Sequence, residues 1–170
     1  MKIFITEEEI QETVELLGHQ ITMDYKDIKE PLIVVGLLKG SFIFMADLVR
    51  KINLPTHIDF MMVSSYNDQN QQEKELRIIL DLNTAIAGRD VLLVEDIVDS
   101  GLSFSKVLEL LQSRNPKSLR TCALLNKKEC RTVEVPLHYC GVEIQNKFVY
   151  GYGLDSSQMR RNLPHIAYEE

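Results

Sequence analysis

Three carboxylates and a glycine follow a short apolar run in the middle of the chain. The run Val-Leu-Leu-Val is followed directly by Glu95 and Asp96, and then by Asp99, Ser100 and Gly101. Small polar residues that open a helix can present backbone N–H groups to an anion, with help from the helix dipole. Carboxylates repel phosphate, so they need another purpose, such as holding ribose hydroxyls or a hydrated Mg²⁺. The pattern therefore favours a sugar phosphate, with its phosphate on the turn and its ribose on the acids.

Two common phosphate motifs are excluded at this segment, and a simpler interpretation stays open. It contains no Gly-Lys-Ser/Thr of a Walker loop, and its turn has one glycine where a dinucleotide fingerprint needs more. Taken alone, Asp99 and Ser100 could merely cap a helix while Glu95 and Asp96 face water. The surrounding elements and motifs have to decide between these interpretations.

Strands and helices are expected to alternate around this segment. Residues 32–38 are apolar without interruption, which is typical of a strand buried on both faces. A Lys-Gly-Ser turn ends this run, and apolar residues at helical spacing extend from Phe42 to Ile52. Further strands are expected at 58–63, 77–82, 91–94 and 119–125, and a further helix after Gly101. This order predicts an α/β fold, with a mostly parallel central sheet flanked by helices.

The remaining segments complete the predicted organisation as a single domain over residues 1–170. Thr6 and Glu9 stand in capping-box positions before an apolar face of helical period, which predicts an opening helix. Residues 64–75 are almost wholly polar and predict a mobile, functional loop. The core is expected at about 30–145. The two chain ends, about 1–20 and 146–170, are expected to form a small cap over it.

Composition and charge narrow the function classes. The chain has 170 residues, is 45% apolar and carries a net charge of −6. A protein that grips nucleic-acid phosphates needs a basic face, so no nucleic-acid partner is expected. The longest apolar run is far short of a membrane span, so no membrane partner is expected either. Three unpaired cysteines, Cys122, Cys130 and Cys140, fit a reduced cytoplasm and packing roles.

The acidic segment closely resembles the phosphoribosyl-pyrophosphate signature of the type I phosphoribosyltransferases, and its residues are similar to those of their hypoxanthine-guanine branch. Four other parts of the chain agree in the same order. They resemble the pyrophosphate loop (38–41), the Ser-Tyr pair of a mobile active-site loop (64–66), the strand with a purine-sensing lysine (124–128), and the purine-stacking and C-terminal segment (147–155 and 161–164). The resemblance runs from about residue 34 to about residue 166, which implies that family's fold.

The resemblance implies a reaction in which a purine displaces pyrophosphate from C1 of phosphoribosyl pyrophosphate. Asp99 matches the general base near N7 of the purine. Glu95 and Asp96 match the pair that holds the ribose hydroxyls, directly or through waters of Mg²⁺. The cradle of the 5′-phosphate corresponds to Asp99, Ser100, Gly101, Leu102 and Ser103. Leu102 and Ser103 stand where human-type relatives carry Lys and Thr; Ser103 keeps the hydroxyl, and Leu102 costs little if its backbone N–H is the binding group.

Other roles follow from the same resemblance. Lys39, Gly40 and Arg161 match the pyrophosphate-binding residues, and the peptide before the lysine can be cis in this family. Ser65 and Tyr66 match the active-site lid. The purine-binding residues are Lys127, which donates to the 6-oxo group, Phe148, which stacks on the base, Val149, which offers a backbone carbonyl, and Asp155, near the purine 2-position. Asp155, Glu95 and Asp96 together also match the metal site, where part of their contact with the ion is made through water.

The expected partners are phosphoribosyl pyrophosphate, a 6-oxopurine and further copies of the same chain, as a homodimer or homotetramer with the segment from Phe42 to Ile52 as a contact surface. Two alternatives belong to other classes. A non-catalytic, nucleotide-sensing regulator of the same fold that binds RNA would need a basic face and would have less use for Asp99, Lys127 and Asp155 together. A kinase-like phosphate-transfer enzyme would need the Walker lysine that is absent here.

Overall fold

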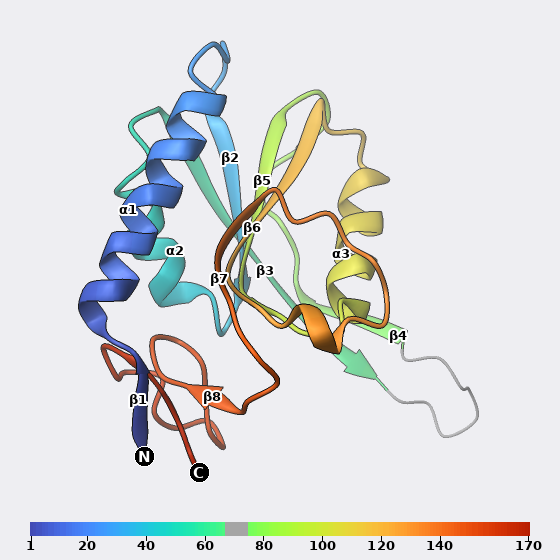
Figure 1. The fold of residues 1–170 in the computed structure, drawn as a ribbon. Helices are drawn as coiled ribbons and strands as arrows, with labels where there is room; N and C mark the ends of the chain where they lie inside the picture. The colour runs from blue at the N-terminus through green and yellow to red at the C-terminus, as the bar shows by residue number, and fades with distance from the viewer. Residues whose placement is uncertain (67–74) are drawn as a thin grey trace.

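The computed structural model describes residues 1–66 and 75–170 of the chain. Within these residues the main layer is a six-stranded sheet with the strand order β4-β3-β2-β5-β6-β7 (Figure 1). Its strands are β2 (Leu32–Leu38), β3 (Thr56–Tyr66), β4 (Glu75–Leu80), β5 (Asp90–Val98), β6 (Ser118–Asn126) and β7 (Tyr139–Glu143). Neighbouring strands pair in parallel, except that β4 runs antiparallel to β3. The predicted α/β fold with a mostly parallel sheet is confirmed.

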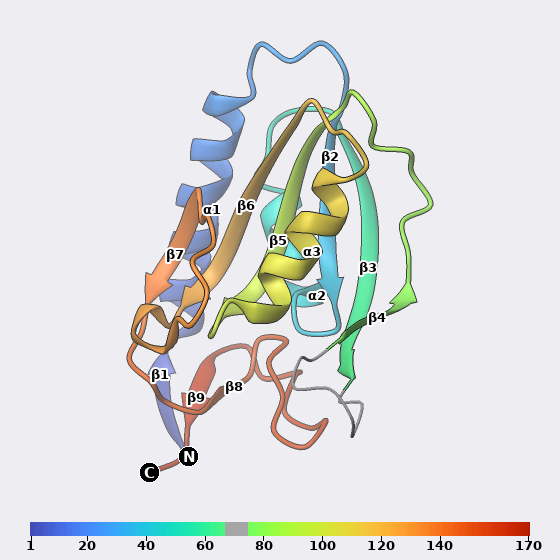
Figure 2. The same ribbon diagram turned by 90° about the vertical axis from the view of Figure 1, so that its right-hand side faces the viewer.

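Helices cover both faces of this sheet, which explains why its central strands are apolar throughout. Helices α1 (Glu7–Asp24) and α2 (Phe42–Val49) lie on one face, and α3 (Leu102–Gln112) lies on the other (Figure 2). Successive strand residues point to opposite faces. Val34 and Leu92 therefore pack in the core beneath α1 and α2, whereas Ile33, Val35 and Leu93 pack in the core beneath α3.

Helix α1 begins as its sequence predicts. The Thr6 hydroxyl accepts a hydrogen bond from the Glu9 backbone N–H, and the Glu9 carboxylate accepts one from the Thr6 backbone N–H, which completes the capping box. Its predicted apolar face is buried, through Ile10, Val14, Leu17 and Ile21. This face joins the core of the central sheet, so α1 belongs to the main body.

The chain termini form a second, smaller sheet. Strand β1 (Lys2–Ile5) pairs antiparallel with β9 (Ile166–Tyr168), which in turn pairs with β8 (Val149–Tyr150). The two termini lie side by side at one end of the molecule (Figures 1 and 2). From the N-terminal segment that was expected in the cap, this sheet contains residues 2–5 and not the helix that follows.

Several element boundaries differ from those expected, and pairing between strands explains the larger differences. Strand β5 does not end at Val94 but continues to Val98, because its ladder with β6 extends to the pair Val98–Asn126. Strand β3 likewise extends past Val63 to Tyr66 through its pairing with β4. The helix expected to reach Ile52 ends at Val49.

Two further observations concern α2 and the helices in general. Phe44, Met45 and Leu48 are the buried residues of α2, whereas Phe42 is 43% exposed. Phe42 is therefore an apolar side chain at the surface of the segment that was expected to contact a second copy of the chain. Among the described residues, no helix is long and apolar enough to cross a membrane.

Candidate active site

A cavity of about 260 Å³ lies where the carboxyl ends of β5 and β6 meet the C-terminal segment. It is lined by Asp96, Ile97, Asp99, Lys127, Phe148, Val149, Leu154 and Asp155. All of these except Ile97 and Leu154 were predicted as site residues from the sequence. Parallel strands collect their carboxyl ends at one edge of the sheet, which is where open α/β sheets bind ligands. The fold therefore brings together predicted residues from three distant segments.

Asp99 and Lys127 form an ion pair at this cavity. The Lys127 Nζ lies 3.5 Å from Asp99 Oδ2, and the Lys127 backbone N–H donates to the Val98 carbonyl. The Lys127 side chain is only 10% exposed, whereas that of Asp99 is 57% exposed. Lysine is usually solvated, so burial beside a carboxylate at a cavity indicates a functional role. The arrangement holds a cation and an accessible proton acceptor next to each other.

The predicted phosphate turn leads directly into α3. Gly101 has φ +84°, and Leu102 begins the helix. The Ser100 carbonyl accepts hydrogen bonds from the backbone N–H groups of Thr132 (2.9 Å) and Val133 (3.2 Å). The first N–H groups of a helix have no partner within its backbone and can bind an anion; at the start of α3 the Leu102 N–H donates to the Ser100 hydroxyl oxygen at 3.3 Å, so the turn also supplies a side-chain partner there. The turn is thus held from behind and opens toward a helix N-terminus, as an anion cradle requires.

The adjacent carboxylates of β5 occupy different surroundings. Asp96 lines the cavity, and its Oδ1 accepts a hydrogen bond from the Ile97 N–H at 2.7 Å. Glu95 is not among the lining residues; its Oε1 accepts from the Asp96 N–H at 3.0 Å. Burial, reinforced by the neighbouring Asp96 carboxylate, raises the pKa of Glu95 well above its ordinary value. Of the pair, Asp96 is therefore the residue that faces a ligand in the cavity.

Three segments touch at Gly40, next to Asp96. A Cβ at Gly40 would overlap the Asp96 carboxylate, and a Cβ at Gly153, which has φ +99°, would overlap the Gly40 carbonyl oxygen. The Leu38–Lys39 peptide is cis. The loop between β2 and α2 therefore lies against both β5 and the C-terminal segment. The contribution of Gly153 was missed from the sequence, where its only signal was the Gly-Tyr-Gly pattern.

The predicted pyrophosphate residues also meet, although Lys39 and Arg161 are far apart in the chain. With Leu38 and Phe42 they line a second cavity, of about 280 Å³. Gln158 Oε1 accepts hydrogen bonds from Lys39 Nζ (3.5 Å) and from Arg161 (3.2 Å). Arg161 also donates to the Gly153 carbonyl and lies 3.3 Å from Asp155. An amide oxygen thus accepts from both cations, and Gln158 was missed by the sequence analysis.

The predicted aromatic and lid residues differ in what the structure says of them. Phe148 lines the cavity with 63% of its surface exposed, which leaves a ring free to stack on a planar ligand. Ser65 is exposed near the end of β3, and Tyr66 is the last residue of that strand. Ser65 is not among the residues that line the cavity. Most of the predicted loop, residues 67–74, lies outside the described residues.

Asp96 and Asp155 line one cavity, but they do not form a closed metal cage. In the part of the chain that the structure describes, no group of three His, Cys, Asp or Glu side chains could hold a metal ion. Mg²⁺ commonly takes one or two carboxylates and completes its shell with water and substrate phosphates. The donor set therefore fits a Mg²⁺ ion that arrives with a phosphorylated ligand.

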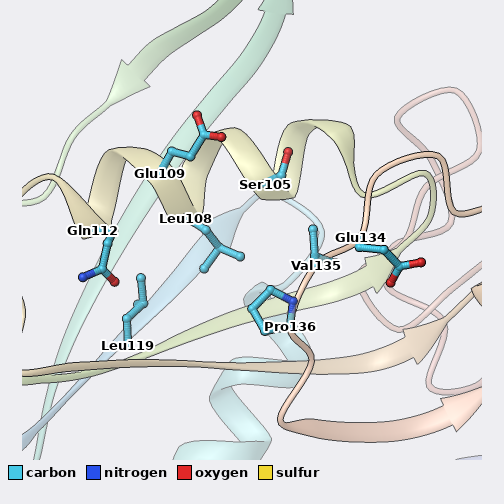
Figure 3. Close-up of a pocket in the computed structure, with 8 residues that line it drawn as sticks. All are labelled: Ser105, Leu108, Glu109, Gln112, Leu119, Glu134, Val135 and Pro136. Carbon is cyan, nitrogen blue, oxygen red and sulfur yellow. The ribbon is translucent and has the colours of Figure 1, made fainter.

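A larger groove lies away from these residues. It has a volume of about 320 Å³ and runs between α3, the start of β6 and the segment 134–136 (Figure 3). Leu108, Leu119, Val135 and Pro136 give it a largely apolar lining. None of its lining residues was predicted as a site residue, and it lacks the converging charged groups of the Asp99 cavity. The Asp99 cavity is therefore the candidate active site.

Comparison with known proteins gives a consistent result. A family model described as a phosphoribosyl transferase domain matches residues 6–157. The hypoxanthine-guanine phosphoribosyltransferase of Dictyostelium discoideum is 51% identical over 168 residues, which cover 97% of this chain and 93% of that protein. The hypoxanthine phosphoribosyltransferase of Escherichia coli K12 is 46% identical over 166 residues, covering 98% and 93%. A crystal structure of a hypoxanthine-guanine phosphoribosyltransferase from Bacillus anthracis superposes with a TM-score of 0.94 at 39% identity, covering 100% and 99%.

Proposed function

Because the chain belongs to the phosphoribosyltransferase family, we propose that it is a purine-salvage enzyme, a hypoxanthine phosphoribosyltransferase. It transfers the 5-phosphoribosyl group from phosphoribosyl pyrophosphate to N9 of hypoxanthine, and of guanine, and releases pyrophosphate with IMP or GMP. The observation that carries this proposal is the single cavity that joins Asp99, Lys127, Phe148 and Asp155. The family's fold accounts for the positions of all four.

The chemistry requires positioning and charge stabilisation more than covalent catalysis. N9 of the purine forms a bond to C1 of the ribose while the bond from C1 to the pyrophosphate oxygen breaks, and the purine N7 proton passes to Asp99. Positive charge develops on the ribose ring and negative charge on the leaving pyrophosphate. Lys39 and Arg161 support the leaving group, and Asp96 holds the ribose hydroxyls. Preorganised charges of this kind supply most of the rate in many enzymes.

One assay tests the proposal. Purified protein, Mg²⁺, phosphoribosyl pyrophosphate and hypoxanthine are mixed, and IMP and pyrophosphate are measured. Equal amounts of the two products are expected. The non-catalytic, RNA-binding alternative predicts RNA binding without either product; the net charge of −6 speaks against it. Absence of turnover with all four components present would overturn the proposed function.

Purine selectivity is a first prediction. Lys127 carries only donors, so it pairs with a 6-oxo group and opposes the 6-amino group of adenine. Backbone carbonyls at Val149 and near Asp155 are proposed to accept N1–H and the 2-amino group of guanine. The 2-oxo group of xanthine would meet an acceptor there, and a buried unpaired polar group costs ~1–3 kcal/mol. Measured kcat/KM should fall roughly ten- to a hundredfold for xanthine and further for adenine, relative to hypoxanthine.

Adjacent lysines provide matched variants for this prediction. Lys127→Gln should lower kcat/KM for hypoxanthine by at least about tenfold. It should also lower the ratio of kcat/KM for hypoxanthine to that for adenine, because an amide can donate or accept a hydrogen bond. Lys128 is exposed and does not line the cavity, so Lys128→Gln should retain the parental ratios. Efficient use of adenine by the unmodified enzyme contradicts the role of Lys127. Efficient use of xanthine contradicts only the proposed chemistry near Asp155.

Magnesium dependence is a second prediction. We propose Mg²⁺ as the cofactor, near Asp96 and Asp155 and, partly through water, Glu95; when bound, it neutralises phosphate charge. Chelation should abolish IMP formation, and added Mg²⁺ should restore it. Because the carboxylates form no closed cage among the described residues, Mg²⁺ alone should leave the Tm within about 1 °C of the metal-free value. Mg²⁺ with phosphoribosyl pyrophosphate at about 100 Kd should add ~2.7 kcal/mol and raise the Tm by several degrees. A large shift with Mg²⁺ alone would indicate a preformed site.

We also propose that the enzyme works in the reducing cytoplasm as a homodimer or homotetramer. Its three cysteines are all unpaired, and Cys122 is a buried packing residue. Exposed apolar side chains on β4 and at the start of α2, namely Ile78, Ile79, Leu80 and Phe42, support association with a second copy. Light scattering at micromolar concentration distinguishes monomer, dimer and tetramer.

A further inference from the structure

The segment that follows β6 contacts Asp99 through the side chains of Lys127, Cys130 and Arg131, and the contact of Cys130 is a side-chain hydrogen bond. Lys127, at the start of this segment, reaches the Asp99 carboxylate. Four residues later, one terminal nitrogen of Arg131 donates a hydrogen bond of 2.6 Å to the Asp99 backbone carbonyl. Arg131 does not line the cavity. It therefore contacts the backbone of the predicted general base without being part of the cavity lining.

The Arg131 guanidinium is anchored to the end of a sheet strand. Its other terminal nitrogen donates to Asn126 Oδ1. Asn126 is the last residue of β6 and is 9% exposed, and its backbone carbonyl accepts from the Ile144 N–H at 2.9 Å. The backbone of Arg131 is set by the short helix η1 (Lys128–Cys130), since its N–H donates to the Lys128 carbonyl. The planar guanidinium thus bridges a fixed strand end and the backbone of Asp99.

We propose that Arg131 is a positioning residue for the phosphoribosyl transfer, which acts by fixing the backbone from which the Asp99 carboxylate reaches the purine. The inference rests on the proposed function. Asp99 needs such support because its side chain is 57% exposed and, among the described residues, is held only by Lys127, at 3.5 Å, and by the Cys130 thiol, a weak hydrogen-bond donor. It also stands two residues before Gly101, where the chain adopts φ +84°. A displacement of about 1 Å at a reacting group can cost about a hundredfold in rate.

The neighbouring phosphate turn has separate support. The Ser100 carbonyl accepts from the backbone N–H groups of Thr132 and Val133, and neither bond involves the Arg131 side chain. The Arg131 side chain also lies against this turn, since a Cβ at Gly101 would come within 3.0 Å of the Arg131 Cδ. Arg131→Gln keeps the side-chain carbons through Cδ and removes only the guanidinium, so it should release Asp99 while the turn stays in place. The kinetic consequence is a loss in kcat with the KM for phosphoribosyl pyrophosphate largely kept.

The test compares Arg131→Gln and Arg131→Lys with the unmodified enzyme. Arg131→Gln, which cannot bridge both oxygens, should lower kcat by about ten- to a hundredfold and change the KM for phosphoribosyl pyrophosphate by less than about threefold. Arg131→Lys keeps a cationic donor for one oxygen and should recover part of that loss. Arg120→Gln is the matched control: Arg120 lies on β6 away from the cavity and donates to the Tyr139 hydroxyl, so kcat should stay at the parental value.

A double-mutant cycle decides whether Arg131 acts through Asp99. If it does, Arg131→Gln should cost less than about twofold when added to Asp99→Asn, because the group it positions no longer accepts a proton. An equal loss in both backgrounds, or an unchanged kcat in the single variant, overturns the inference. Circular dichroism and Tm establish that each variant is folded. If Arg131→Gln does not fold, the comparison between Arg131→Lys and the unmodified enzyme still decides the question. An unmodified enzyme that makes no IMP contradicts the proposed function instead.

Discussion

Asp99→Asn should lower kcat by at least about tenfold, because a well-placed general base contributes ~10²–10⁴-fold to the rate. Asparagine keeps the size of the side chain and its hydrogen bond to Lys127, but it cannot take up the purine N7 proton. The 5′-phosphate turn does not depend on the Asp99 carboxylate, since Thr132 and Val133 hold the Ser100 carbonyl. The KM for phosphoribosyl pyrophosphate should consequently change by less than about threefold. Initial-rate measurements over both substrate concentrations separate the two effects.

Asp81→Asn is a control of matched chemistry. Asp81 is also a partly exposed aspartate with a cationic partner, since its carboxylate lies 2.8 Å from Arg114. That pair lies outside the cavity and holds the pKa of Asp81 below its ordinary value through the Arg114 hydrogen bond. Removing it should leave kcat unaltered. Parental turnover in Asp99→Asn would contradict the role of Asp99 as the general base. The alternative role that the sequence left open, a cap of the following helix, is excluded for Asp99 by the structure, because the N-cap of α3 is Gly101 and the Asp99 carboxylate caps no N–H group of that helix.

Gly153→Ala should be strongly destabilising and should impair catalysis in the protein that still folds. Alanine is strained at φ +99°, at a cost of ~1–2 kcal/mol, and its Cβ would overlap the backbone carbonyl oxygen of Gly40. A backbone atom cannot move aside as a flexible side chain can, so the loop has to shift. With overpacking costs of ~1–3 kcal/mol added, we expect the free energy of unfolding to fall by roughly 2–5 kcal/mol. The shift also displaces Asp155 from the cavity and should lower kcat/KM at least about tenfold.

Gly88→Ala separates backbone strain from the contact with Gly40. Gly88 has φ +71°, and a Cβ built there meets nothing within 4 Å. This variant should lose only ~1–2 kcal/mol of unfolding free energy and keep its kcat/KM. Urea denaturation with a common m-value gives the unfolding free energies of the two variants, and initial-rate measurements give their kcat/KM values. If the two variants lose the same stability and activity, the contact between the C-terminal segment and the pyrophosphate loop has no energetic role.

Local sequence patterns predicted the elements that carry their own signals. The uninterrupted apolar run of β2 required burial on both faces, and the structure buries it beneath helices on each side. The capping box at Thr6 and Glu9 marked the first turn of α1 because both partners lie within one turn of helix. The candidate residues around Asp99 came mostly from the family resemblance, and the structure gathers six of them at one cavity because parallel strands bring their carboxyl ends to one edge.

Contacts between distant segments could not be obtained in this way. Strand β5 carries Glu95 and Asp96 within it because its ladder with β6 continues past the apolar run, and no local pattern specifies how far a partner strand extends. Gly40 needs to be glycine because a Cβ there would overlap the Asp96 carboxylate, and Gly153 because a Cβ there would overlap the backbone carbonyl oxygen of Gly40. Gln158 was unremarkable until folding placed its amide oxygen within reach of both Lys39 and Arg161.

The sequence by itself therefore determined the α/β architecture and the cap of α1, since these depend on residue type and short-range spacing, and its resemblance to a known family supplied the candidate site residues. The tertiary structure decided which groups share a cavity, which glycines are obligatory, and that Arg131 bridges Asn126 and the Asp99 carbonyl. These features depend on distances between atoms of separate segments. Such distances are set by the packing of whole strands and helices, and no stretch of the chain encodes them locally.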